Sequence, residues 1–279
     1  MPGTRPIHNT AIHYFPAYMI TSNHNPRIKF VRALQGRARE RRDAGAFVAD
    51  GVRLVEEAAN SNWIFQFALY DETLNERGKI LIENLKSHGV EVEEVSASVM
   101  KSLSETETPQ GILAVLEFTQ LPVVPHFDFI LIPDQIRDPG NLGTLLRTAA
   151  ATGVQAVLIP PETTDAFSPK VLRSGMGAHF RLPIIPKSWE EIEQVVKSSS
   201  LQVLIADMGG NSCWETDLCQ SLALIVGSEA EGASDAARKL ANQQISIPMS
   251  GAVESLNAGV AGSILMFEVV RQRVVNNKQ

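Results

Sequence analysis

The second half of the chain consists of short apolar runs separated by longer segments of helical period. Runs of this kind are typical of parallel strands that are buried on both faces of a sheet. We expect six strands, at 129–132, 156–159, 182–185, 201–206, 223–226 and 245–247. A long helix should follow the last strand, and it opens with Ala258-Gly259-Val260-Ala261-Gly262-Ser263. Small residues lower helix propensity, so this cluster indicates close packing or close approach of a ligand.

The first half of the chain also alternates between short apolar runs and segments of helical period. Helices are expected at 26–42, 52–60 and 76–87, and strands at 47–49, 63–70, 90–95 and 112–116, which predicts a compact three-layer α/β unit. Residues 119–127 carry Pro122 and Pro125 without periodicity and are the expected linker. We therefore predict a flexible arm over residues 1–22, a first domain over 23–118 and a second domain over 128–279.

Charge adds one local feature. The chain has 25 basic and 31 acidic residues, so its overall balance does not indicate nucleic-acid binding. Between Arg27 and Arg53, however, eight basic side chains stand against three acidic ones. A basic stripe can bind phosphate even on an acidic protein.

Other compositional features exclude several classes of protein. Cys213 and Cys219 lack the spacing of a zinc site, so we expect free thiols in the reducing cytoplasm. The apolar run at 11–20 is short and contains His13 and Pro16, and it resembles neither a signal peptide nor a membrane anchor. His8 and His13 have no acidic or thiol partner nearby, so no metal site is predicted.

The first strand of the second half leads into a polar turn and a helix, DQIRDPGNLGTLLRTAA. We expect Asn141 to cap this helix. A helix that begins there has an apolar face of leucine and alanine and carries Arg147 on the opposite face, among small residues. An arginine in such surroundings favours a phosphate contact, because guanidinium binds phosphate through two hydrogen bonds. A surface or ion-paired arginine would show the same pattern.

Two later loops follow strands of the same predicted sheet. In IVGSEAEGAS, Gly227 and Gly232 allow tight turns, whereas Glu229 and Glu231 would repel a pyrophosphate. The loop therefore favours a cationic ligand without phosphates. The next loop, between Pro248 and Asn257, is rich in polar residues. Loops at the carboxyl ends of parallel strands usually form the ligand crevice of an α/β sheet.

The segments NLGTLLRTAAATG, IVGSEAEGAS and IPMSGAVESLN resemble, in this order, the three motifs of the SpoU (TrmH) branch of the SPOUT RNA methyltransferases. The match covers about residues 129–273. The first half, ending in KSLSETETPQGILAVLE, is similar to that family's substrate-binding domain, which looks like kink-turn-binding ribosomal proteins. The resemblance implies methylation of a ribose 2'-hydroxyl in RNA with S-adenosylmethionine. It also implies a trefoil-knotted parallel-sheet domain and a homodimer whose active site forms at the interface.

The resemblance also assigns candidate residues. The catalytic candidates are the polar residues of the three motifs, namely Asn141, Arg147, Glu229, Ser255 and Asn257. The adenosine of the cofactor is expected against Gly227, Ile247, Met249 and Leu256. Candidate RNA contacts are the basic residues Arg27, Lys29, Arg37 and Arg53, and Arg173 of the segment 171–178. The family commonly continues ESLN with Val-Ser, whereas this chain has Ala258-Gly259, so we expect altered packing at the knot or dimer interface without loss of chemistry.

Guanidinium stays protonated, so we expect Arg147 to bind the RNA phosphate beside the target ribose and not to act as the general base. The base is left open among Ser255, Asn257 and Glu229. Ribosomal RNA is favoured over transfer RNA because of the N-terminal RNA-binding-like domain, while the nucleotide and any role in antibiotic resistance are open. The alternative is a catalytically silent RNA-binding or ribosome-assembly protein on the same fold.

Overall fold

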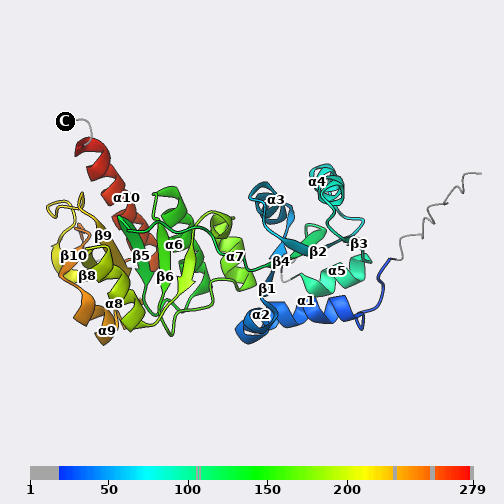
Figure 1. Ribbon diagram of the computed structural model, residues 1–279, viewed down its shortest axis with the longest axis horizontal. Coiled ribbons are helices and arrows are strands. Elements are labelled where there is room, and N and C mark those ends of the chain that lie inside the picture. The colour runs from blue at the N-terminus through cyan, green and yellow to red at the C-terminus, as the bar shows by residue number, and fades with distance from the viewer. Residues whose placement is uncertain (1–18, 105, 107, 229–230, 252–254, 277–279) are drawn as a thin grey trace, which may run out of the picture.

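The computed structural model describes residues 19–104, 106, 108–228, 231–251 and 255–276, which form two α/β units, each around its own sheet. The two units lie side by side along the long axis of the molecule, with the N-terminal unit in blue and cyan (Figure 1). The predicted arm at 1–22 falls mostly outside the described residues.

The N-terminal unit has a mixed sheet of β1 (Ala46–Asp50), β2 (Phe65–Tyr70), β3 (Val92–Glu94) and β4 (Ile112–Glu117), in the order β1-β4-β2-β3. Strand β4 is antiparallel to β1 and β2, whereas β2 and β3 are parallel. Helices α1 (Pro26–Gly36) and α5 (Ala97–Leu103) bury their apolar side chains on one face of the sheet. Helices α3 (Val52–Asn60) and α4 (Glu76–Ser87) cover the other face.

The predicted helices at 52–60 and 76–87 are confirmed, and the predicted helix at 26–42 is wrong as a single element. It is divided into α1 and α2 (Ala38–Ala44) by Arg37, which is extended at φ −130° and ψ 135°. Helix α5 was not predicted. Its N-cap is Ser96, whose hydroxyl accepts a hydrogen bond from the N–H of Val99.

The C-terminal unit contains six parallel strands in the order β10-β8-β9-β5-β6-β7, which confirms the predicted parallel sheet. They are β5 (Phe129–Pro133), β6 (Ala156–Ile159), β7 (Ile184–Pro186), β8 (Gln202–Ser212), β9 (Leu222–Val226) and β10 (Gln243–Ser246). Helices α6 (Pro139–Ala151) and α10 (Ala258–Asn276) contribute to the core on one face of the sheet. Helices α8 (Trp189–Ser198) and α9 (Asp235–Leu240) cover the other.

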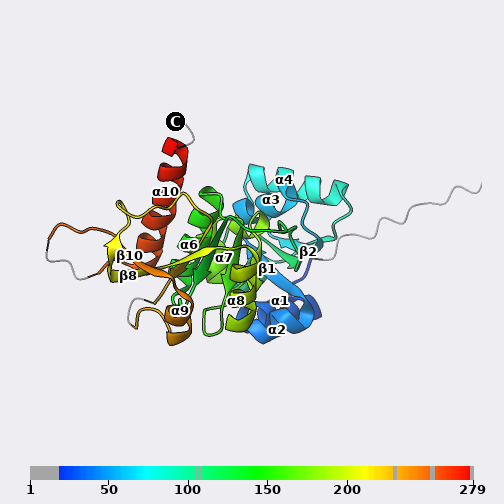
Figure 2. The ribbon, with the colours of Figure 1, turned by 60° about the vertical axis from the view of Figure 1, so that its left-hand side comes forward.

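The small residues at the start of α10 allow it to lie directly against α6 (Figure 2). A Cβ on Gly262 would overlap the side chain of Leu145, and a Cβ on Gly259 would lie 3.3 Å from the Cβ of Thr144. The expectation of close packing around the small-residue cluster is therefore confirmed. At Gly259 a side chain would be in tight contact with α6 and would fit only if its neighbours moved by a few tenths of an ångström.

The two units share an interface built from α7 (Pro169–Gly175) and the 3-10 helix η1 (Ala178–Phe180). The indole Nε1 of Trp63 donates to the carbonyl of Phe180 at 3.3 Å. Arg41, expected on an open basic helix, is only 3% exposed, and its Nε donates to Asp165 at 2.7 Å. Aromatic rings from both units meet around this contact, namely Phe47, Trp63, Phe118, Phe167 and Phe180. The units thus pack directly on each other in addition to being joined by the segment 118–128.

Candidate functional site

A cavity of about 290 Å³ opens at the edge of the parallel sheet where the neighbouring strands β9 and β10 end and β8 extends beyond β9. It is lined by the middle of β8, by the ends of β9 and β10 and the segments that follow them, and by the first two turns of α10. The lining includes Ser255 and all four residues predicted to contact the adenosine, Gly227, Ile247, Met249 and Leu256. The fold therefore brings two of the three sequence motifs to one cavity.

The loop after β9 turns back on itself beside this cavity. Ser228 and Gly232 exchange two backbone hydrogen bonds, each 3.0 Å long. A Cβ on Gly227 would lie 2.6 Å from the backbone nitrogen of Ala233, so no other residue fits there without a shift. Of the two acidic residues of this loop, Glu229 lies outside the described residues, and Glu231 forms an exposed ion pair with Arg137 at 3.4 Å.

Asn141 and Asn257 connect the first motif with the third. The Nδ2 of Asn257 donates to the Oδ1 of Asn141 at 2.8 Å, and the Oδ1 of Asn257 accepts from the N–H of Val260 at 3.1 Å. Asn257 thus caps α10 while it holds the start of α6. The prediction that Asn141 caps α6 is wrong, because Asp138 takes that position and its Oδ1 accepts from the N–H of Asn141 at 2.9 Å.

Comparison with known proteins identifies this arrangement. Residues 128–267 match the sequence model of the SpoU rRNA methylase family, and residues 25–114 match that of the MRM3-like substrate binding domain. This chain belongs to the SpoU rRNA methylase family. The predicted family and the predicted cofactor, S-adenosylmethionine, are confirmed, as is the division into a substrate-binding unit and a methylase unit.

Several relatives match this SpoU methylase over almost its full length. The 23S rRNA (guanosine(2553)-2'-O)-methyltransferase RlmP of Bacillus subtilis is 34% identical over 90% of this chain and 98% of that protein. The 23S rRNA (uridine(2479)-2'-O)-methyltransferase of Streptomyces viridochromogenes is 30% identical over 93% of this chain and 94% of that protein. The crystal structure of the SpoU methyltransferase AviRb from Streptomyces viridochromogenes, in complex with AdoMet, superposes with a TM-score of 0.80 at 28% identity. The superposition covers 90% of this chain and 100% of the AviRb chain.

The cavity of the SpoU methylase suits a cofactor that has a nucleoside but no phosphate. Neither lysine nor arginine occurs among the described residues that line it, and apolar side chains supply much of its wall. Its one described acidic residue is Asp207, whose carboxylate pairs with Arg238 at 2.9 Å. S-Adenosylmethionine carries a positive sulfur and no phosphate, so these residues fit it.

Asp207 and Met208 line the cavity but were not predicted from the sequence. The predicted strand ended at Ala206, whereas β8 continues to Ser212 and carries both side chains to the sheet edge. The backbone N–H of Gly209 donates to Asp207 and lowers the pKa of that carboxyl group. The sequence did contain a signal for Asp207. It is a polar residue directly after the predicted buried strand, at the sheet edge where the neighbouring loops carry motifs.

Asp134 anchors the loop after β9 from the end of β5, and it was not predicted either. Its carboxylate is completely buried, and Oδ2 accepts a hydrogen bond of 2.6 Å from the backbone N–H of Ser234. Burial raises the pKa of Asp134, and the hydrogen bonds from Ser234 oppose that shift. Ser234 in turn caps α9, so Asp134 fixes the far end of the loop that begins at Gly227.

Arg147 does not line the cavity of its own chain. It lies exposed on α6, next to Thr148, whose hydroxyl is 2.8 Å from that of Ser263 on α10. No carboxylate in the described part of the chain pairs with it. One chain therefore pairs Asn141 with Asn257, whose neighbours Leu256 and Ala258 line the cavity, and leaves Arg147 on the surface of the α6–α10 pair.

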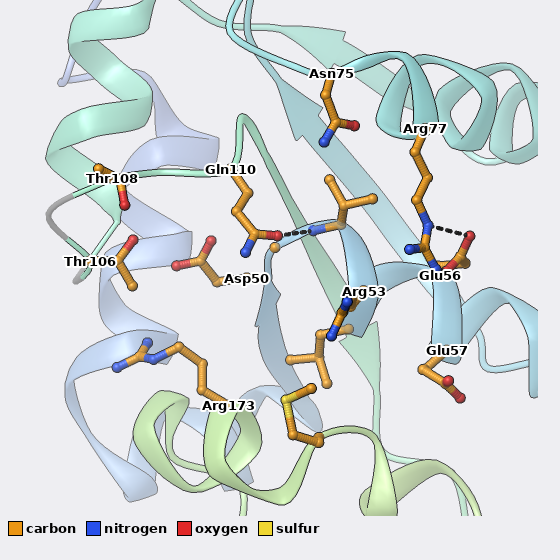
Figure 3. A pocket seen from close by; sticks show the side chains of 14 residues that line it. Asp50, Arg53, Glu56, Glu57, Asn75, Arg77, Thr106, Thr108, Gln110 and Arg173 are labelled. Atoms are coloured by element: carbon orange, nitrogen blue, oxygen red, sulfur yellow. Dashed lines mark hydrogen bonds and ion pairs between the residues drawn. The ribbon is translucent and has the colours of Figure 1, made fainter.

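The five basic candidates do not form one surface. Arg27 is held in ion pairs with Glu91 at 2.6 Å and Glu93 at 3.0 Å. Lys29 and Arg37 are exposed on the side of the sheet that α1 covers. Arg53 lies at the start of α3 on the opposite side, where it and Arg173 of the methylase unit line one cleft (Figure 3).

Metal and membrane features are absent from the portion of the chain that the structure describes. No group of three or more histidine, cysteine, aspartate or glutamate side chains there could hold a metal ion. None of the helices there combines the length and the apolar character that a membrane span requires. Cys213 and Cys219 are both free thiols.

Proposed function

We propose that this protein, an S-adenosylmethionine-dependent rRNA 2'-O-ribose methyltransferase, modifies the 23S ribosomal RNA. One observation supports the chemistry above all others. The cavity without lysine or arginine lies beside the start of α10, where Asn257 binds Asn141. The names of the two relatives from Bacillus subtilis and Streptomyces viridochromogenes support the substrate.

When bound, S-adenosylmethionine supplies a methyl group on a positively charged sulfur. The residues of the cavity hold the cofactor, with Gly227, Ile247 and Leu256 against its adenosine and Met249 beside them. Asn141 and Asn257 hold α6 and α10 together and orient the ribose hydroxyl, and Ser255 faces the same cavity. Because the reaction needs the acceptor oxygen in line with the methyl group, this positioning supplies much of the rate enhancement.

Arg147 binds the phosphate next to the target ribose, where its charge also stabilises the developing alkoxide. It cannot take the hydroxyl proton, because guanidinium stays protonated. Glu229, Ser255 and Asn257 are the residues that can orient this proton or pass it on. To separate them, each residue is replaced by alanine and the rate of methyl transfer is measured over a range of pH at saturating cofactor. Loss of the base removes the pH dependence of the rate that this group causes.

The substrate is tested with total cellular RNA and cofactor that carries a labelled methyl group. We expect label in 23S rRNA, at one nucleotide that resists alkaline cleavage because its 2'-hydroxyl is methylated. Label confined to transfer RNA or to 16S rRNA would contradict the choice of substrate. Cofactor binding without transfer to any RNA would support the alternative of a silent RNA-binding protein.

We also propose that the enzyme works as a homodimer in which Arg147 serves the cavity of the partner subunit. Helix α10 exposes an apolar stripe, with Val260 44%, Ile264 38% and Phe267 54% exposed, at successive turns beside α6. A second copy of the chain fits this stripe, because an isologous contact would cover it and bring Arg147 to a cavity that its own chain does not offer it.

Mixed dimers test this arrangement. By the roles given above, Arg147→Ala should be inactive on its own and Asn257→Ala should retain at most about a tenth of the wild-type activity. If the two residues come from different subunits, an equal mixture refolded together regains about a quarter of the wild-type activity, because half of the dimers contain one intact site. No recovery in a mixture that contains heterodimers would contradict the proposal. Phe267→Glu should convert the dimer to a monomer in sedimentation experiments.

Two finer predictions belong to the same proposal. The C-terminal segment forms a trefoil knot, which is supported by the way the loop 227–232 and the start of α10 line the same cavity. A crystal structure in which α10 reaches α6 without passing through a loop would contradict it. The enzyme resides in the cytoplasm, in keeping with its two free thiols.

A further inference from the structure

A cleft of about 1000 Å³ lies between the substrate-binding unit and the methylase unit (Figure 3). One wall comes from the junction of β1 and α3, the start of α4 and the residues before β4. The other wall comes from α7 and the residue after it, with Arg173 and Met176. Both units are therefore needed to form the cleft.

The charged side chains that line the cleft differ in their ion pairs. Glu56 pairs with Arg77, and Glu57 pairs with Arg181, so these carboxylates are neutralised locally. Arg53 is exposed, and no described carboxylate pairs with it. Arg173 reaches the cleft from the opposite wall (Figure 3). Arg53 and Arg173 thus line one cleft from the two units, and the guanidinium group of Arg173 extends towards the side on which Thr106 and Asp50 lie (Figure 3).

The start of α3 adds backbone donors to the wall that carries Arg53. Its N-cap is Gly51, which has a φ of 102° and no side chain to cap the helix. The Oε1 of Gln110 accepts from the N–H of Val52 at 2.9 Å, and a Cβ on Gly51 would lie at the same distance from that oxygen. The following amides of the first turn have no intrahelical acceptor and carry the positive end of the helix dipole.

Hydrogen-bonding groups of neutral or negative character complete the cleft. Asp50 accepts a hydrogen bond from the hydroxyl of Ser104 at 3.2 Å, and Thr106, Thr108 and Gln110 surround it (Figure 3). A carboxylate would repel a bare phosphate but accepts hydrogen bonds from sugar hydroxyls. Guanidinium groups together with such acceptors suit a ribose-phosphate backbone, because the 2'-hydroxyl is what distinguishes RNA from DNA.

We propose that this cleft holds a segment of the substrate RNA outside the target nucleotide, with Arg53 and Arg173 each in contact with a phosphate of its backbone. The neighbouring ribose hydroxyls contact Asp50 and the polar side chains around it. This inference rests on the proposed function, since the RNA in the cleft is the RNA that is methylated. It differs from a general basic surface, because one of the two arginines belongs to the methylase unit.

The position of the cleft relates the bound RNA to the reaction site. Helix α7, which carries Arg173, packs on α6 so closely that a Cβ on Gly143 would overlap Ser174 and come within 2.9 Å of the nitrogen of Gly175. The opposite side of α7 contributes Leu172 to the core of the substrate-binding unit. RNA held by Arg53 and Arg173 is therefore held at a set distance from α6, which carries Asn141 and Arg147.

The test compares Arg53→Ala, Arg173→Ala and the double variant with the wild-type enzyme. Arg39→Ala is the matched control, because it removes the same charge from an arginine that is 82% exposed on α2. RNA affinity is measured by fluorescence anisotropy over a range of salt concentrations, and KM and kcat are measured with saturating S-adenosylmethionine. Thermal unfolding shows which variants are folded, and Arg53→Gln and Arg173→Gln replace any alanine variant that is not.

We expect each cleft variant to raise KM and the RNA dissociation constant about three- to tenfold, with a shallower dependence on salt. Cofactor affinity and kcat at saturating RNA stay near the wild-type values, and Arg39→Ala changes neither KM nor RNA affinity. An RNA with deoxyribose outside the target nucleotide should bind more weakly to the wild type, and Asp50→Ala should lose much of this discrimination.

Two outcomes separate this inference from the proposed function. If the wild type methylates ribosomal RNA and the cleft variants bind it as tightly as Arg39→Ala does, the proposal that the cleft binds RNA is wrong. The proposed function then stands. If the wild type methylates no RNA, the proposed function fails. The anisotropy comparison of the same variants then still decides whether the cleft binds RNA.

Discussion

Asn257 donates a hydrogen bond of 2.8 Å to Asn141, a residue 116 positions earlier in the chain. The same side chain accepts from the N–H of Val260 and thereby caps α10. One amide therefore caps α10 and joins its start to α6. Since the proposed cofactor cavity is lined by the first two turns of α10, this amide connects the stability of the helix with the geometry of that cavity.

Replacement of Asn257 separates capping from bridging. Asn257→Ala removes both functions, and we expect a loss of about 1 kcal/mol in the free energy of unfolding. Cofactor affinity and methyl transfer should also fall, transfer by at least about tenfold. Asn257→Ser retains a capping oxygen but is too short to reach Asn141, so it should recover the stability without recovering transfer. Urea denaturation, calorimetry and methylation assays measure the three quantities. Full activity of Asn257→Ala would remove this residue from the site.

Arg147→Ala should abolish transfer, by about 100-fold or more, and leave cofactor affinity nearly unchanged. The reason is that Arg147 lies outside the cavity of its own chain and its proposed contact is the RNA phosphate. Isothermal titration with S-adenosylmethionine and methylation of ribosomal RNA measure the two effects, with Arg39→Ala as the control. A variant that has lost cofactor binding would contradict this division of roles.

Two glycines of α10 should differ in their tolerance of a side chain. Gly262→Ala places a methyl group where Leu145 already lies, and we expect a loss of about 1–3 kcal/mol in the free energy of unfolding in spite of the better helix propensity of alanine. Gly259→Ser has its nearest contacts at 3.2 to 3.4 Å, so its cost should be smaller. Denaturation by urea gives both values. A Gly262→Ala variant that is more stable than the wild type would show that α6 and α10 are not tightly packed.

His179, at the interface of the two units, predicts a pH dependence of stability. Its Nε2 lies 2.7 Å from the carbonyl oxygen of Ala166, and burial lowers its pKa from 6.5 to about 4. Below pH 6.5 the unfolded chain binds a proton that the folded chain does not bind, so stability is lost as the pH falls towards 4. This residue alone accounts for a loss of up to about 3 kcal/mol.

His179→Gln is the matched variant, because glutamine retains a donor but does not titrate. We expect the free energy of unfolding of this variant to change less between pH 7 and pH 5 than that of the wild type. Equal pH dependence of the two proteins would exclude His179 as the cause. Variation of pH at constant ionic strength keeps the surface ion pairs comparable.

Local patterns were sufficient for most of the secondary structure. The helices at 52–60 and 76–87 and all six strands of the second sheet follow from apolar periodicity, because a helix or buried strand has to present apolar side chains at a regular spacing. The predictions that were wrong concern helix ends, where the conformation or the capping side chain of one residue decides the boundary. Arg37 interrupts the expected basic helix, and Asp138 takes the capping position that Asn141 was expected to fill.

Charge patterns were the least informative. The stripe between Arg27 and Arg53 looks continuous in the sequence, but Arg27 is neutralised by Glu91 and Glu93, and Arg41 is buried against Asp165. The partners of Arg41 and Arg27 lie far along the chain, so no local window contains them. An ion pair between distant positions depends on the fold and has no signature in sequence spacing.

The sequence by itself determined the family, the cofactor and the parallel sheet, because motifs and periodicity are properties of short segments. The tertiary structure decided which of these segments meet. It placed Asn141 against Asn257, extended β8 so that Asp207 joins the cavity, and set Arg53 opposite Arg173 across the cleft. The physical reason is that such contacts join residues far apart in the chain, and only the packing of helices and strands around the two sheets brings them together.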